Sequence, residues 1–133
     1  MRKIAQMALV GALAAASLGL TGGTASALES DCWPSQDDNG TDCRILHQDS
    51  KGYYIDSVQF NSYGEHLQEW DYATNGEGVM ADINDDRYYW LVGDYYDWNL
   101  SYDEGSQIWL TSCQFKAGGT GSPYDCYTRL AIA

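Results

Sequence analysis

The stretch YDWNLSYD at residues 96–103 decides the fold, because apolar and polar side chains alternate strictly along it. Successive side chains of a β-strand point to opposite faces, so this pattern predicts a strand with one buried face. Outward from it, similar alternation recurs at residues 79–83 and 126–132. Residues 108–115 are apolar on both parities, which predicts a central strand buried on two faces. The other strand candidates are residues 44–47, 53–60, 65–72 and 88–92, and residues 65–70 also fit a short helix.

Turn signals separate these segments. The pair Asn75-Gly76 suits a two-residue hairpin, because both residue types tolerate positive φ, and a polar run at residues 84–86 interrupts the chain in the same way. No long segment carries the helical period of 3.6 residues. Turns recurring about every 8–12 residues are typical of small all-β domains. The sequence therefore predicts an all-β protein, a small antiparallel β-sandwich of about 7–8 strands.

The chain has four cysteines, an even number: Cys32, Cys43, Cys113 and Cys126. An even set in an exported chain predicts two disulfides, for which three pairings are formally possible. We favour Cys32 with Cys43 and Cys113 with Cys126, because each pair flanks a turn-rich segment that would bring its ends together. Neither pair has the close C-x-x-C spacing of zinc ligands, which disfavours a zinc site.

The N-terminus predicts export. Residues 1–27 combine two early cations, an apolar alanine-rich run and a final Ala-Ser-Ala, the pattern of a secretory signal peptide cut after Ala27. Residues 28–42 are expected to form an acidic loop segment, and residues 43–133 a single β domain. Loss of Arg2 and Lys3 with the leader would change the formal net charge from −12 to −14. Such a charge excludes nucleic acid as a partner, and no mature segment is expected to span a membrane.

Three motifs resemble a group of small secreted actinobacterial proteins of uncharacterised function. They are V-x-F-x-x-YGE-x-L at residues 58–67, Asp71 followed by NG-x-GV at residues 75–79, and NLS-x-x-EG at residues 99–105. The resemblance implies an exported β-sandwich-like domain and carries over no catalytic residue. Small two-disulfide α-amylase inhibitors present a Trp-Arg-Tyr triplet, whereas residues 87–90 hold these residue types in another order, so no role is transferred.

Calcium is the one cofactor that the sequence suggests. Asp82, Asn84 and Asp86 place three oxygen-bearing side chains at alternate positions, and calcium is held by several oxygens from a short loop. The glycine and distant glutamate of an EF-hand are missing, because Arg87 and Gly93 stand there. A polar hairpin tip without any metal is the preferred interpretation, so the expected cofactor set is none.

Carbohydrate binding would use exposed aromatic rings flanked by carboxylates or amides. Tyr88, Tyr89 and Tyr95 lie in the Tyr/Trp-rich region 88–98 and are the candidate binding residues, Tyr89 and Tyr95 because they fall on the parity opposite Trp98. The alternative is that the rings of this region fill the core, since the chain contains only two phenylalanines.

Catalysis has no recognisable motif in this chain. Glu65, Glu69, Asp71 and Glu104 could form the carboxylate pair of a glycosidase, but 19 acidic residues make chance pairs common. The two histidines lack a serine partner in a known motif. The sequence therefore predicts a secreted, monomeric, non-enzymatic binding protein whose partner is an extracellular protein or a glycan. A carbohydrate-binding module or a hydrolase inhibitor is the alternative, and a small glycosidase is the rival class.

Overall fold

The computed structural model describes residues 27–36, 39–118 and 122–133, and all regular secondary structure in these ranges is β-strand. The all-β prediction is therefore confirmed, with nine strands where about 7–8 were expected. The predicted signal peptide lies outside the described residues except for Ala27. The strands are β1 (Ala27–Pro34), β2 (Thr41–Gln48), β3 (Tyr54–Asn61), β4 (His66–Asp71), β5 (Glu77–Ile83), β6 (Arg87–Leu91), β7 (Asp94–Asn99), β8 (Gln107–Lys116) and β9 (Tyr124–Ile132).

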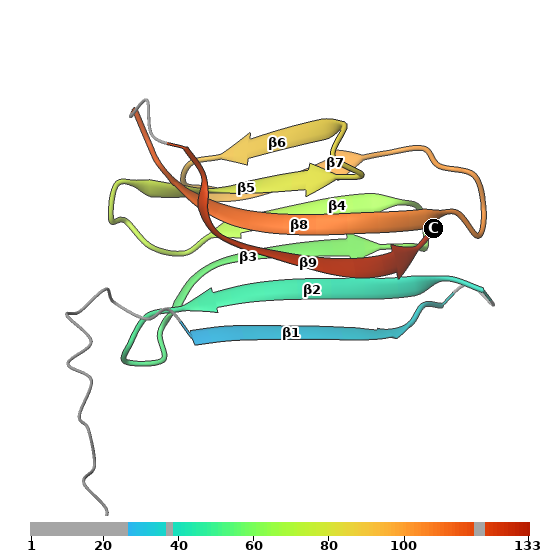
Figure 1. The fold of residues 1–133 in the computed structure, drawn as a ribbon, viewed down its shortest axis with the longest axis horizontal. Helices are drawn as coiled ribbons and strands as arrows, with labels where there is room; N and C mark the ends of the chain where they lie inside the picture. Colours follow the sequence, from blue (N-terminus) through green and yellow to red (C-terminus); the bar gives the residue numbers. More distant parts are fainter. Residues whose placement is uncertain (1–26, 37–38, 119–121) are drawn as a thin grey trace, which may run out of the picture.

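The nine strands form one antiparallel sheet that folds over on itself. Its hydrogen-bonded order is β6-β5-β8-β9-β2-β3-β4-β7, and β1 pairs with β2. The link between β9 and β2 is the single pair Ile132 and Thr41, so the sheet bends there into two layers. One layer is the five-stranded sheet β1-β2-β3-β4-β7, and the other is the four-stranded sheet β6-β5-β8-β9. Figure 1 shows β5, β8 and β9 in front of β3 and β4, with β1 and β2 along the lower edge.

The hydrophobic core lies between these two layers. Each strand contributes alternate side chains, as the period of two requires. Val58 and Phe60 of β3 face Val79 and Ala81 of β5 across the layers, and all four are fully buried. The remaining buried members of the core cluster are Cys43, Ile45, Leu67, Ile83, Ile108, Leu110, Ala131 and Ala133. The core is thus mainly aliphatic, and rings such as Trp98 and Tyr102 pack at its margin.

Both disulfides join neighbouring strands in the predicted pairing. Cys32 of β1 is bonded to Cys43 of β2, and the two residues lie directly opposite each other in the register. Cys113 of β8 is bonded to Cys126 of β9. The two disulfides are compatible with an extracellular location.

Two local expectations are wrong. Residues 28–34, expected as part of a loop, belong to β1, because eight consecutive register pairs with β2 override the low strand propensity of their acidic and proline residues. The second error concerns β8, which is central but is not buried on both faces. Trp109 is 50% exposed on its outer side, since none of the described strands packs over that face of the four-stranded sheet.

Candidate functional site

The outer face of the five-stranded sheet carries a row of polar side chains that crosses all five strands. Because the opposite parity of each strand fills the core, these residues point outward. The strand register places them side by side. We call this set the central row, and its members in strand order are Asp31, Arg44, Gln59, Gln68 and Asp97.

Hydrogen bonds connect polar side chains of β3, β4 and β7 on this face. Asn61 Nδ2 donates to Gln68 Oε1 at 2.9 Å, and Gln68 Nε2 donates to Asp97 Oδ2 at 3.0 Å. The Tyr95 hydroxyl donates to the same Asp97 oxygen at 3.0 Å, and His66 Nδ1 donates to Asp97 Oδ1 at 2.6 Å. We call these five residues, together with Gln59, the polar ladder, since Gln59 Nε2 donates to Asn61. Their amide and carboxylate groups are therefore oriented before any ligand arrives.

The ladder keeps its carboxylate ionised. Partial burial alone would raise the pKa of Asp97, but the hydrogen bonds from Gln68, His66 and Tyr95 lower it below its usual value. The pKa of Tyr95 is raised, first by burial and then by its hydrogen bond to the Asp97 carboxylate. Asp97 is thus an acceptor and Tyr95 a donor, and neither is a source of protons near neutral pH.

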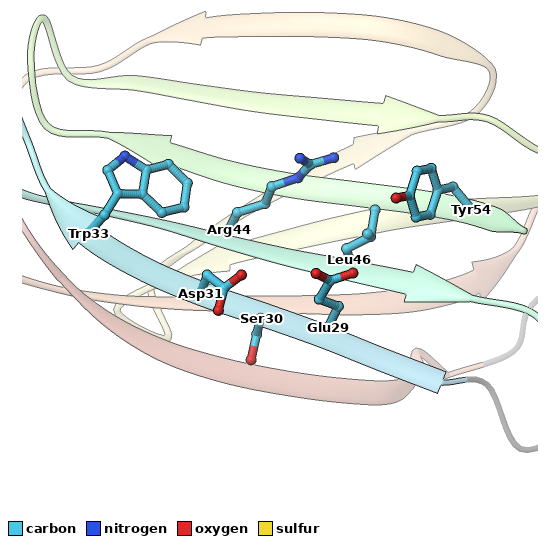
Figure 2. Close-up of a pocket in the computed structure, with 7 residues that line it drawn as sticks. All are labelled: Glu29, Ser30, Asp31, Trp33, Arg44, Leu46 and Tyr54. Carbon is cyan, nitrogen blue, oxygen red and sulfur yellow. The ribbon is translucent and has the colours of Figure 1, made fainter. Parts of the chain in front are cut away.

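Two hollows lie on this same face. The larger, of about 300 Å³, follows the ladder from β7 to β2 and is lined by Gln36, Asp42, Asn61, Tyr63, His66, Gln68 and Asp97. The smaller, of about 140 Å³, lies over β1 and β2. Figure 2 shows the Trp33 and Tyr54 rings at opposite ends of the smaller hollow, with the Arg44 side chain between them and the Asp31 and Glu29 carboxylates beside it.

Aromatic rings border the polar surface. Tyr63 is exposed beside the larger hollow, and the rings of Trp70 and Tyr95 lie 5.1 Å apart at the neighbouring position of β4 and β7. No known protein family, curated protein or solved structure matches this chain. On this face, oriented amides and carboxylates lie between exposed rings. Within the described residues, no helix is long and apolar enough to cross a membrane.

The three tyrosines predicted as binding residues do not form one patch. Tyr95 belongs to the ladder and is 45% exposed. Tyr88 is 56% exposed but lies on β6, in the other layer. The prediction of a surface position is wrong for Tyr89, which pairs with Ala81 of β5, packs on the core and contacts the Trp98 ring at 5.2 Å. The two-residue period of β6 sends Tyr89 inward and its neighbours outward.

This difference between adjacent tyrosines predicts unequal effects on stability. Tyr89→Ala should lower the free energy of unfolding by about 2 kcal/mol, because it removes a ring from the edge of the core. Tyr88→Ala should stay within about 0.5 kcal/mol of the parent, because its ring is exposed. Urea unfolding followed by tryptophan fluorescence compares the two variants directly. Equal costs would contradict the assigned orientation of β6.

The proposed calcium ligands lie in and around the β5–β6 turn. Asn84 and Asp85 have positive φ values of 60° and 57°, as the hairpin requires, and Asn84 Oδ1 accepts the backbone N–H of Trp109 at 2.7 Å. Asp82 is buried on β5, and its burial and the charges of Asp85 and Asp86 raise its pKa. Among the described residues, no group of three or more His, Cys, Asp or Glu side chains is placed to hold a metal ion. Asn84 and Asp85 form the tip of the β5–β6 hairpin.

A buried ion pair lies between the two layers and was not predicted from the sequence. His47 Nδ1 donates to Asp56 Oδ1 at 2.5 Å, and His47 Nε2 donates to the carbonyl oxygen of Asp125 at 2.9 Å. Because both ring nitrogens face acceptors, His47 carries both protons and a positive charge. Burial opposes this charge, but Asp56 and Asp125 raise the pKa of His47 overall. Gln114 Nε2 donates to Asp56 Oδ2 at 3.1 Å, so both carboxylate oxygens have partners.

Glu69 is a second buried acid, on the inward side of β4. It is fully buried, its Oε1 accepts the backbone N–H of Ala81 at 2.9 Å, and its Oε2 has no hydrogen-bond partner among the described atoms. Burial raises the pKa of Glu69 to about 9, the charge of Asp56 adds to this, and the Ala81 hydrogen bond acts in the opposite direction. Glu69 is therefore protonated at neutral pH. Its position in the interior keeps it away from any dissolved substrate.

Proposed function

We propose that this protein is an extracellular, non-enzymatic carbohydrate-binding protein whose site is the outer face of the five-stranded sheet. The observation that carries the proposal is the polar ladder, in which Asn61, Gln68 and Asp97 are held in one orientation on three adjacent strands. Sugar hydroxyl groups both donate and accept hydrogen bonds. Oriented amides and carboxylates offer the matching acceptors and donors.

The surrounding rings support a sugar more than a generic polar partner. The faces of aromatic rings stack on the C–H groups of a sugar, while its hydroxyls bond to polar neighbours. Tyr63, Trp70 and Tyr95 provide such rings beside the ladder. Because ladder residues bond to one another in the free protein, less side-chain freedom is lost when a ligand binds.

The properties of the carboxyl groups favour binding over hydrolysis. A glycosidase needs one carboxyl group with a raised pKa to protonate the leaving oxygen and a second one nearby that stays ionised. Asp97, which lines the larger hollow, has a lowered pKa. Glu69 has the raised pKa, but it is fully buried between the layers. These two groups lie on opposite sides of the five-stranded sheet and cannot act on one bond.

The proposal predicts that Gln68→Leu weakens carbohydrate binding at least tenfold, because it leaves the amide of Asn61 and the carboxylate of Asp97 without their shared partner. The measurement is retardation of the purified protein in native gels that contain soluble glucans, xylans, mannans or pectins, followed by calorimetry with the polysaccharide that retards it most.

The control is Thr111→Val, which removes an exposed hydrogen bond to Thr128 on the four-stranded sheet and leaves the ladder intact. We expect this variant to bind like the parent. Absence of binding to every polysaccharide, or equal weakening by the two substitutions, would refute the proposed site.

A further inference from the structure

We infer that the ligand is an extended, uncharged oligosaccharide chain that runs across the strands from β7 to β1, an inference that rests on the proposed carbohydrate site. The two hollows adjoin each other on β2. Asp42 lines the larger hollow and Arg44 lines the smaller one, and these residues are successive outward positions of β2. A ligand that leaves the ladder across β2 therefore enters the second hollow directly.

The length of the central row also indicates a chain of several sugars. The central row crosses five strands, and neighbouring strands lie about 4.8 Å apart, so the row spans about 19 Å from Asp97 to Asp31. A disaccharide can occupy the ladder but cannot also reach β1. A chain of about four sugars is needed to contact both ends of a row of that length.

Aromatic rings lie near both ends of the central row. Trp33, on β1, lies at the far side of the face from Tyr95 on β7, and its ring is exposed in the smaller hollow. Figure 2 shows this ring on β1, beside the Arg44 side chain of the neighbouring strand. One ring near each end of the row suits a chain that stacks at two separate sugars.

The charged side chains that line the two hollows favour an uncharged ligand. Among the described residues that line the two hollows are four acids, Glu29, Asp31, Asp42 and Asp97, and a single arginine, Arg44. Uronic, sialylated or sulfated glycans would be repelled by this surface. Several of the carboxylate oxygens are already paired, since Asp42 accepts the backbone N–H of Ser62 and Asp97 has three donors. The carboxylates of Asp42 and Asp97 therefore present their remaining lone pairs to hydroxyl groups.

The experiment is a chain-length series. Calorimetry is carried out with glucose, xylose, mannose and N-acetylglucosamine oligosaccharides of two to six units, with oligogalacturonates as anionic probes and glucosamine oligomers as cationic probes. For the neutral series that binds, we expect Kd to fall at least tenfold between two and four units and then to level off. Oligogalacturonates are expected not to bind.

Two variants separate the ends of the face. Trp33→Ala should raise Kd for the tetrasaccharide about three- to tenfold and leave the disaccharide unchanged, because only the longer chain reaches β1. Gln68→Leu should weaken both. Trp109→Ala removes a tryptophan of the four-stranded sheet that is more exposed than Trp33, 50% against 36%, and should change neither.

The outcomes distinguish this inference from the proposed function. Binding with no dependence on length, or loss of disaccharide and tetrasaccharide alike in Trp33→Ala, would overturn the extended chain while leaving carbohydrate binding intact. Binding of only the anionic or only the cationic oligomers would overturn the uncharged ligand. Absence of binding to every probe would overturn the proposed function itself.

Discussion

Replacing Asp56 with leucine is expected to lower the free energy of unfolding by about 3–5 kcal/mol. The substitution leaves the His47 imidazolium between the two layers without its counter-ion, and it removes the acceptor of Gln114. A buried charge without a partner is far more costly than a missing exposed one, because water cannot reach it. Urea unfolding at pH 6, followed by tryptophan fluorescence and far-UV circular dichroism, measures the change.

The control for Asp56→Leu is the second histidine–aspartate pair of the same protein. His66 and Asp97 lie at a similar distance, 2.6 Å, but their side chains are 38% and 31% exposed. Asp97→Leu should cost no more than about 1 kcal/mol. The double variant His47→Leu/Asp56→Leu should cost clearly less than the sum of its single variants, because it leaves no uncompensated charge. A cost below about 1 kcal/mol for Asp56→Leu would contradict a desolvated ion pair.

Glu69→Gln is expected to stabilise the protein at pH 7 by about 3 kcal/mol and to flatten its pH dependence. In the folded protein Glu69 keeps its proton up to a pKa of about 9, whereas the unfolded chain releases it near the ordinary pKa of a glutamate, 4.5. Between these values the folded state binds more protons than the unfolded state. Stability therefore falls as pH rises, by about 1.4 kcal/mol per pH unit from this group. Glutamine keeps the acceptor for the Ala81 N–H and has no proton to lose.

The measurement is the free energy of unfolding of parent and Glu69→Gln at half-unit steps from pH 5 to pH 9. The difference between the two curves isolates Glu69, since His47 contributes to both. The raised pKa of His47 gives stability that is complete below 6.5 and is lost as pH rises through the folded value, so it has the same sign. Glu65→Gln is the control. Glu65 accepts the backbone N–H of Tyr102, and a glutamine at this position can still accept it. Parallel curves for parent and Glu69→Gln would show that Glu69 is ionised in the fold.

Alternation and turn chemistry were sufficient to predict the fold class. The pattern at residues 96–103 placed Trp98 and Leu100 against the core, as found, because a two-residue period needs only the local sequence. The same reasoning failed for Trp109, since no local signal tells whether a third layer covers a strand. It also failed for β1, where pairing with β2 and the Cys32–Cys43 bond outweigh the composition of the segment.

The candidate site could not be predicted without the register of the strands. Asn61 and Gln68 lie seven residues apart across the β3–β4 hairpin, but Asp97 lies 29 residues beyond Gln68, and only the pairing of β4 with β7 brings it beside them. A weak signal did exist, because each of these strands carries polar side chains on the parity that faces away from the core. Without the strand order, that signal cannot be told from ordinary solvated surface. The buried charge of His47 gave no signal at all, since its partner lies on another strand.

The way the sheet ends has a consequence for behaviour at high concentration. Its two terminal strands, β6 and β7, are each paired with one neighbour only, and the charged side chains Arg87 of β6 and Asp94 and Asp97 of β7 lie on these edges. Among the described strands β1 forms a backbone ladder with β2 alone, and this edge strand carries Asp31 and ends at Pro34. Charges and proline on an edge oppose the addition of a foreign strand. We therefore expect a protein that stays dispersed at high concentration and resists growth into β-rich aggregates.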